Sequence, residues 1–219
     1  TRMAALSLAE PGGSRDRILD AAEALFARRG YAGVGMREVA DAAGLGKSSL
    51  FHHFHTKADL YVAVAQRMLD VFERRLTRAL AAGGNPRERL DRWVDTLIDL
   101  LAEDQRCARL FLRSLFEEDA DLVAHEDRSA DEAIVRIITG ISMVLREGID
   151  AGLFRPASIP HTVQSIVGLT VYHFASGEFG EQLLGRSTFA PGEVKRRKLE
   201  VRGLLHGGLV ARSGSTATP

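Results

Sequence analysis

The chain has 219 residues, of which 45% are hydrophobic and 26% are charged, so it is long enough for one or two domains with a real apolar core. Its 29 basic and 29 acidic residues cancel, which argues against a general binder of polyanions, because such affinity comes from neutralising phosphates. Cys107 is the single cysteine, which excludes an intramolecular disulfide. No apolar run approaches the roughly 18 residues of a membrane span, and no secretory signal is apparent, so we expect a cytoplasmic protein without membrane contact.

Apolar residues recur at helical spacing along most of the chain, and strand patterns are nearly absent. We therefore expect an all-α fold of about nine helices. Residues 1–13 are typical of a flexible arm. The first helix covers residues 14–29, with Asp16 in its first turn and Gly30 at its end. Its apolar face consists of Ile18, Ala21, Ala22, Leu25 and Phe26.

Two very short helices follow, over residues 36–43 and 47–54, and a glycine turn joins them. A helix of about eight residues is marginal alone in water, so neither is explained by its own stability. Gly44 can adopt the left-handed conformation that ends a helix. Leu45 in the turn can pack with Leu50 from the second helix. Two short helices crossing at a steep angle form a helix-turn-helix, whose second helix fits the major groove of DNA.

The outer face of the second short helix is polar, aromatic and cationic, and no acid lies between Gly44 and Ala58. Such residue types contact phosphates and base edges. Lys57 follows in the first turn of the next helix, where we expect it to hold a phosphate. The alternative is an ordinary pair of solvated helices. The expected DNA-binding residues are Arg37, Lys47, Ser48, Ser49, Phe51, His52, His53 and Lys57.

One long pattern runs through these elements. It comprises Ile18-Leu19-Asp20-Ala21-Ala22-Glu23-Ala24-Leu25-Phe26, Gly30-Tyr31, Met36 to Ala43, Gly46 to Phe54, and Lys57 to Leu60. On this pattern residues 14–61 resemble the DNA-binding domain of TetR-family (tetracycline-repressor-type) transcription regulators. The resemblance covers about the first quarter of the chain. Gly35 and Gly46 stand where the family usually has a hydroxyl residue. Glycine has no side chain, so the resemblance does not extend to a side-chain phosphate contact at either position.

The next helix begins at Thr56, where Thr56 and Asp59 match a capping box with Asp in place of Glu. It continues to about residue 82 and, at about 1.5 Å per residue, spans nearly 40 Å. A helix of this length would link the DNA surface mechanically to a second domain. We therefore expect a helix-turn-helix domain over residues 14–60 and a second helical domain over residues 61–211.

The second domain contains five further predicted helices, over residues 86–103, 106–116, 128–151, 158–176 and 191–210. The acidic stretch 117–121 and the glycine-rich stretch 177–190 are typical of loops, and residues 212–219 of a disordered tail. A metal site in the acidic stretch is the lesser alternative, and we expect no metal and no cofactor. The basic run at residues 195–198 favours a solvated face or the rim of a helix-packing interface over a second nucleic-acid patch.

The resemblance implies a homodimer, because in this family the last two long helices pack against their copies in a second subunit. The apolar stripes that could do so are Val163, Ile166, Val167, Thr170, Val171 and Phe174, with Val194, Val201, Leu204, Leu205 and Leu209. The alternative is that both stripes are buried within one subunit. A dimer would also present two recognition helices to a palindromic double-stranded operator.

The resemblance further implies a small-molecule effector site inside the second domain. Its residue types favour a mostly apolar or aromatic molecule with one polar end. For each residue the alternative is an ordinary place in the core. The candidate ligand-binding residues are Trp93, Leu97, Cys107, Phe111, Arg113, Phe116, Met143, Gln164, Tyr172 and His173.

No nucleophile elbow, Walker loop, dinucleotide fingerprint or metal-binding histidine pair is present, which argues against an enzyme. We interpret the chain as a DNA-binding transcriptional regulator, a repressor that a small ligand releases from its operator. The alternatives are a helical interaction protein and a DNA-binding regulator without an effector.

Overall fold

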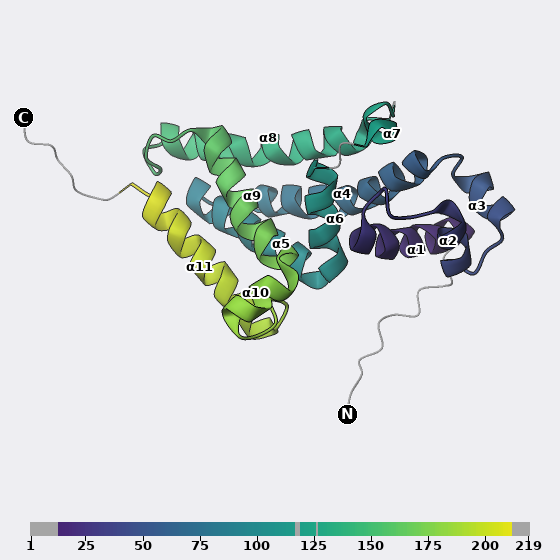
Figure 1. Cartoon of the computed structure of the whole chain (residues 1–219). Helices are drawn as coiled ribbons and strands as arrows, with labels where there is room; N and C mark the ends of the chain where they lie inside the picture. Colours follow the sequence, from purple (N-terminus) through teal and green to yellow (C-terminus); the bar gives the residue numbers. More distant parts are fainter. Residues whose placement is uncertain (1–12, 117–118, 126, 212–219) are drawn as a thin grey trace, which may run out of the picture.

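The computed structural model describes residues 13–116, 119–125 and 127–211. Over these residues it contains eleven helices and no strand, apart from an isolated bridge between Phe154 and Val210. The all-α fold is therefore confirmed (Figure 1). The helices are α1 (Ser14–Arg29), α2 (Met36–Ala42), α3 (Lys47–His53), α4 (Lys57–Ala81), α5 (Pro86–Glu103), α6 (Gln105–Phe116), α7 (Ala120–Val123), α8 (Ser129–Asp150), α9 (Ile159–Ala175), α10 (Gly177–Leu184) and α11 (Pro191–Leu209).

Two short helices lie where the sequence pattern indicates loops. Asp119 caps α7, because its side chain accepts a hydrogen bond from the amide of Asp121 at 3.1 Å. Gly177 and Gly185 bracket α10 with φ angles of 57° and 68°, so the glycines that favour a loop mark the two ends of a helix instead. Residues 1–12 of the expected arm, the expected tail over 212–219 and two residues of the acidic stretch, 117 and 118, lie outside the described residues.

The first three helices and the start of α4 enclose one small core. Ile18, Val39, Leu50 and Leu60 are each 0% exposed, and they come from α1, α2, α3 and α4 in turn. Since every short helix contributes a fully buried side chain, packing supplies the stability that α2 and α3 lack as isolated helices. The arrangement agrees with the predicted helix-turn-helix domain.

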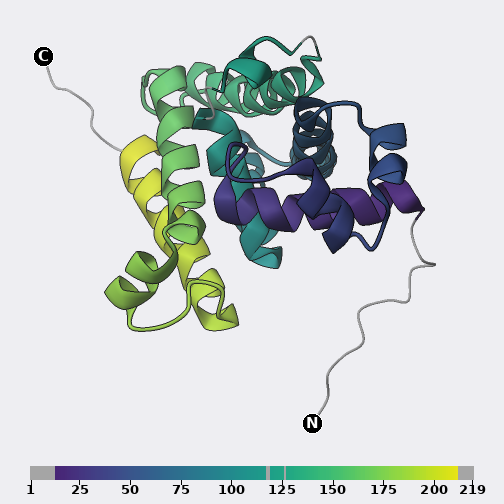
Figure 2. The same cartoon turned by 45° about the vertical axis from the view of Figure 1, so that its right-hand side comes forward.

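Helix α4 runs without interruption from this domain into the second one. The capping box at its start is formed as predicted: Thr56 Oγ1 accepts from the amide of Asp59 at 3.0 Å, and an Asp59 oxygen accepts from the amide of Thr56 at 2.8 Å. With 25 residues the helix is about 37 Å long. Helices α1–α3 lie at one end of the molecule and α9–α11 at the other (Figures 1 and 2).

The apolar stripe of α9 packs inside the subunit, against α5 and α8. Val163, Ile166, Thr170, Val171 and Phe174 are at most 6% exposed. This stripe is not free to meet a second subunit, so for α9 the alternative of burial within one subunit holds.

Helix α11 packs against α5 through both apolar and charged side chains. Val201, Leu205 and Leu209 are buried, while Leu204 is 59% exposed. Two ion pairs and one histidine–carboxylate contact join the two helices: Asp95–Arg202 at 3.5 Å, Asp99–Lys198 at 2.6 Å and Asp91–His206 at 2.7 Å. Each helix places these groups four residues apart, so the pairs form a ladder along an antiparallel helix pair. Lys198 of the basic run thus lies at a helix-packing interface.

Candidate nucleic-acid interface and apolar cavity

The turn between α2 and α3 has the geometry of a helix-turn-helix. Gly44 has a φ of 65°, a left-handed conformation that favours glycine. The amide of Leu45 donates to the Ala40 carbonyl at 2.9 Å, which closes the C-terminal end of α2. Leu50 points into the core, so the opposite side of α3 faces outward at the tip of the molecule (Figure 1).

The outward side of α3 carries cationic, hydroxyl and aromatic groups and no carboxylate. Lys47, Ser48 and His52 are exposed, while Ser49, Phe51 and His53 are half-buried. The Lys47 ammonium lies 5.5 Å from the Phe51 ring centroid, and the rings of His52 and His53 meet edge to face at 5.4 Å. Among the described residues Lys47 forms no ion pair. This face therefore offers a positive charge and hydrogen-bonding groups to an anionic partner.

Lys57 has an internal role that its position in the sequence does not reveal. Its ammonium donates to the Tyr31 carbonyl at 3.1 Å and lies 4.1 Å from the centroid of the Tyr31 ring. An ammonium carries three donors, so a phosphate contact at Lys57 would use a donor that Tyr31 leaves free.

Two arginines complete the positive surface near the turn. Arg37 is exposed in the first turn of α2. Arg15, in α1, holds its guanidinium 5.3 Å from the centroid of the Phe54 ring, at the end of α3. Sequence reasoning missed Arg15, because nothing in the first turn of α1 indicates that it reaches a residue 39 positions later.

The loop region around α7 touches the DNA-binding domain at Tyr31, between α1 and α2, and at Asp59, in the first turn of α4. His125 Nε2 lies 2.9 Å from an Asp59 oxygen, and the Tyr31 hydroxyl lies 3.4 Å from an Asp121 oxygen. Burial raises the pKa of Tyr31 to about 12, with a further contribution from the charge of Asp121. Burial also acts to raise the pKa of Asp59, but hydrogen bonds from His125 and Thr56 outweigh it and lower that pKa below its usual value.

Charged groups also tie α1 to α4 and α6. Arg67 of α4 binds Asp20 at 2.8 Å and Glu23 at 2.6 Å. Arg106 of α6 approaches Glu23 at 3.9 Å. A shift of α4 or α6 would therefore pull directly on α1, which supports α2 and α3.

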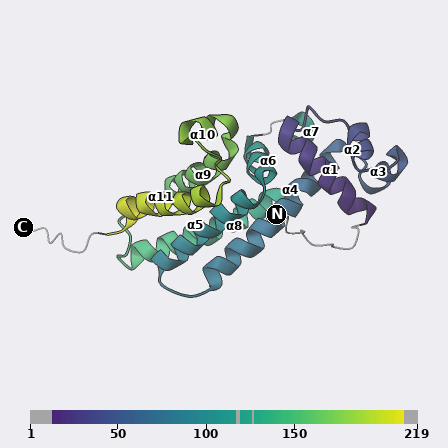
Figure 3. The same cartoon turned by 90° about the horizontal axis from the view of Figure 1, so that it is seen from below.

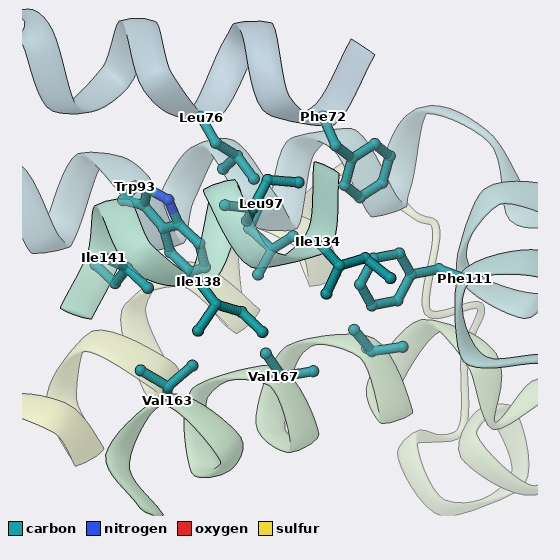
Figure 4. Close-up of a pocket in the computed structure, with 12 residues that line it drawn as sticks. Phe72, Leu76, Trp93, Leu97, Phe111, Ile134, Ile138, Ile141, Val163 and Val167 are labelled. Carbon is teal, nitrogen blue, oxygen red and sulfur yellow. The ribbon is translucent and has the colours of Figure 1, made fainter. Parts of the chain in front are cut away.

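An apolar cavity of about 60 Å³ lies inside the second domain, between α4, α5, α6, α8 and α9 (Figure 4). Phe72 of α4 stacks on Phe111 of α6 at its rim, with ring centroids 5.7 Å apart. The lining side chains are all hydrophobic; they are Phe72, Leu76, Trp93, Leu97, Phe111, Ile134, Ile137, Ile138, Ile141, Val163, Val167 and Val171.

An open groove of about 700 Å³ adjoins this cavity and shares Ile138, Val163, Val167 and Val171 with it. Its remaining lining includes polar side chains, so the two hollows together run from a dry interior to a polar mouth. The additional groove residues are Leu112, Ser142, Pro160, His161, Gln164, Gly168 and Tyr172.

The structure separates the candidate ligand residues into three groups. Trp93, Leu97 and Phe111 line the cavity, and Gln164 and Tyr172 line the groove. Cys107, Arg113, Met143 and His173 lie elsewhere. The side chain of Phe116 is outside the described part of the chain. Sequence reasoning missed the contributions of α4 and α8, whose apolar residues have the same spacing as ordinary core positions.

Three of the residues outside the cavity have other surroundings. Met143 is 58% exposed on α8. Cys107 lies beside Glu23 and Asp104; burial and the nearby carboxylates raise the pKa of its thiol to about 12. Burial, and then the charge of Arg197, lower the pKa of His173 to about 4, and its Nε2 has no partner among the described residues.

The chain is similar in sequence to curated transcription regulators. It is 38% identical over 105 residues to the HTH-type transcriptional activator FasR of Mycolicibacterium smegmatis, covering 48% of this chain and 46% of that protein. It is 31% identical over 132 residues to the HTH-type transcriptional repressor KstR of the same organism, covering 58% and 65%. The chain thus aligns with about half of the length of FasR and just under two thirds of KstR.

The fold is similar to that of a solved regulator structure. The crystal structure of the transcriptional regulator FadR from Bacillus subtilis in complex with stearoyl-CoA superposes with a TM-score of 0.71. That match has 20% sequence identity and covers 88% of this chain and 98% of FadR. At this identity the likeness shows the fold alone.

None of the described helices combines the length and the apolar composition that crossing a membrane requires. The family model for bacterial regulatory proteins of the tetR family matches residues 18–64, which contain the helix-turn-helix. The model for the tetracyclin repressor-like C-terminal domain matches residues 86–202, more than half of the chain. The chain therefore belongs to the TetR family of bacterial transcription regulators, which are DNA-binding proteins rather than enzymes.

Proposed function

We propose that the protein is a dimeric repressor that binds a palindromic operator and is released from it by a ligand with a linear apolar chain. The single observation that carries this proposal is the pairing of two features. The acid-free face of α3 lies at one end of α4. Two side chains of α4, Phe72 and Leu76, line an apolar cavity.

On the DNA side, Ser48, Ser49, His52 and His53 supply the groups that contact base edges. Lys47, Arg37 and Lys57 supply charge to phosphates, and Phe51 packs on the sugar-phosphate wall. The helix α3 has only seven residues, so one copy reads too few base pairs for a specific site. Two copies related by a twofold axis would read a palindrome.

On the dimer side, the outer face of α11 supplies the contact. Leu199 and Leu204 of α11 are 56% and 59% exposed. At Gly207 a Cβ would meet no atom within 4 Å, so another helix can approach the backbone closely there. This outer face replaces the inward stripe of α9, which the subunit itself covers.

On the ligand side, the cavity and groove favour a chain-like apolar molecule with a polar end. The cavity offers no side chain that could hold a charge, so only apolar atoms are stable in it. The groove adds His161, Gln164 and Tyr172, which can orient a polar group. FadR, which shares the fold, binds stearoyl-CoA, a ligand of this shape and polarity. At about 60 Å³ the cavity is smaller than such a chain, so binding would push α4, α6 and α9 apart.

An anisotropy titration with labelled operator DNA from the region upstream of the gene tests the proposal. We expect tight, salt-dependent binding of two protein chains per palindrome, and release by a fatty acyl ligand. The fluorescence of Trp93, which lines the cavity, should change over the same ligand range. A regulator without an effector would bind operator but not respond to acyl ligands, and a helical interaction protein would not bind operator at all.

A further inference from the structure

A further hollow, of about 490 Å³, lies between α1, α6 and α10, apart from the apolar cavity and the open groove. Figure 3 shows α6 between α1 on one side and α9 with α10 on the other. Three arginines line it, Arg28 from α1 and Arg109 and Arg113 from α6, against one acidic side chain in the described lining, Glu178. We call this hollow the arginine groove.

The three guanidinium groups have no carboxylate partner among the described residues. Arg28 donates to the Ala24 carbonyl at 3.2 Å, and Arg113 donates to the Arg28 carbonyl at 3.4 Å. Every ion pair between described residues involves other side chains, including those of the neighbouring Arg29 and Arg106. Three like charges in one hollow repel one another, and an anion with several oxygens would relieve that repulsion and accept bidentate hydrogen bonds.

The start of α10 adds to the positive character of the groove. Ser176 precedes α10, but its hydroxyl donates to the His173 carbonyl at 2.9 Å and does not cap the helix. The first amides of α10 therefore lack a side-chain acceptor, and they favour negative charge. Arg109 Nη2 lies 3.1 Å from the position that a Cβ of Gly177 would take, so the absence of a side chain at Gly177 lets the guanidinium reach this helix end.

The arginine groove lies next to the open groove, which forms the polar mouth of the apolar cavity. Leu112 lines both the mouth and the arginine groove. Along α9, Tyr172 belongs to the mouth, and Ala175 and Ser176 to the arginine groove, one helical turn further on. One turn is about 5.4 Å, so a single ligand can place an apolar chain in the cavity and a charged end against the arginines.

We propose that the arginine groove binds the phosphate or diphosphate groups of the effector. This inference rests on the proposed function for the source of those phosphates, namely the charged end of the same ligand whose chain occupies the cavity. Because Arg28 belongs to the DNA-binding domain and Arg109 and Arg113 to the second domain, the anion would bridge the two. Ligand charge would then act on α1 directly, besides any effect of the chain on α4.

Calorimetric titration of the full chain with three probes tests this inference. The probes are octanoate, which supplies the chain and a carboxylate but no phosphate, coenzyme A, which supplies the phosphates but no acyl chain, and octanoyl-CoA, which supplies both the acyl chain and the phosphates. They are titrated into the unmodified protein, the double variant R109Q/R113Q and the control R146Q, which removes an exposed arginine from α8. Glutamine keeps hydrogen-bonding capacity, and equal unfolding temperatures establish that the variants fold.

We expect octanoyl-CoA to bind the unmodified protein at least tenfold more tightly than octanoate does. The double variant should weaken the binding of octanoyl-CoA and of coenzyme A at least tenfold and change that of octanoate less than twofold. R146Q should match the unmodified protein for all three probes.

The remaining outcomes separate the two proposals. If the double variant binds octanoyl-CoA and coenzyme A as tightly as the unmodified protein does, the arginine groove is overturned and the apolar effector stands. If coenzyme A binds through the arginines but octanoate does not bind, the arginine groove stands as a site for a free phosphate compound. The proposal of an apolar effector in the cavity is then overturned. If none of the three probes binds, both are overturned.

Discussion

Charged side chains are used in opposite ways at the two ends of the molecule. Along α5 and α11 each aspartate of the ladder has a basic partner within 3.5 Å. On the outer face of α3, Lys47 lies beside the Phe51 ring and has no ion-pair partner among the residues that the structure describes. Paired charges fix two elements of the fold against each other, whereas unpaired charges remain available to a partner. The difference separates residues that hold the subunit together from residues that face a ligand, and it can be tested by mutation.

The largest expected effect is on operator affinity when α3 loses a base contact. Alanine at Ser48 or His52 should weaken binding to the operator by about 1–3 kcal/mol and relax the preference at one base pair. Both side chains are exposed, so the free energy of unfolding should change by less than about 0.5 kcal/mol. Anisotropy titrations with cognate and substituted operators measure the first quantity, and urea denaturation measures the second. Unchanged affinity and preference in both variants would mean that another element reads the DNA.

A smaller effect is expected when only a phosphate contact is lost. Lys47→Ala should weaken binding to all sequences alike and reduce the slope of log affinity against log salt by about one unit. R146Q, remote from α3, is the matched control and should leave the slope unchanged. If the slope for Lys47→Ala equals that of the control, Lys47 lies outside the interface.

Loss of a charge from the ladder between α5 and α11 should lower the stability of the protein and leave its operator affinity unchanged. Asp91→Asn removes the carboxylate that faces His206 at 2.7 Å and should lower the free energy of unfolding by about 0.5–1 kcal/mol, since the pair is only partly screened from solvent. The operator affinity of the folded protein should not change. A loss of operator affinity without a loss of stability would remove the distinction between the two ends of the molecule.

The expected effect that is smallest near neutral pH, and that grows on acidification, concerns His173. Burial and Arg197 lower the pKa of His173 from 6.5 to about 4 in the folded protein, so the unfolded chain binds a proton more readily than the folded one does. The folded state therefore loses stability as the pH falls from about 6.5 to about 4. His173→Gln should make the fall in unfolding free energy shallower over this range, as urea titrations at several pH values would record. An identical pH profile in the variant would contradict the lowered pKa.

The helix-turn-helix could be predicted from the sequence because its determinants are local. Gly44, Leu45 and Leu50 lie within seven positions, and their spacing specifies the turn and the buried side of α3. The same locality explains the capping box at Thr56 and Asp59, whose two partners are three residues apart. Local patterns also identify the outward residues of α3, because removing the buried positions leaves only one exposed side.

The cavity could be predicted only in part, because it depends on which helices meet. Trp93 and Phe111 were recognisable as large apolar residues, but nothing local indicates that Phe72 of α4 stacks on Phe111. Cys107 has the same apolar character as these residues, yet it lies beside Glu23 and Asp104 and not in the cavity. The His125–Asp59 contact joins positions 66 apart. Arrangements of this kind follow from tertiary packing, which periodicity within single helices does not encode.

Helix α4 can act as a lever between the cavity and the DNA-binding domain. It is continuous over 25 residues from Lys57 to Ala81, and a rigid rod of about 37 Å converts a small rotation into a large displacement. A tilt of about 5° about Ala81, at the far end of the helix, would move Lys57 by about 3 Å over such a length. In a twofold dimer the two tips would move in opposite directions, so their separation would change by up to about twice that amount. Successive major grooves on one DNA face lie about 34 Å apart, and a mismatch of this size would be shared by both half-sites at once.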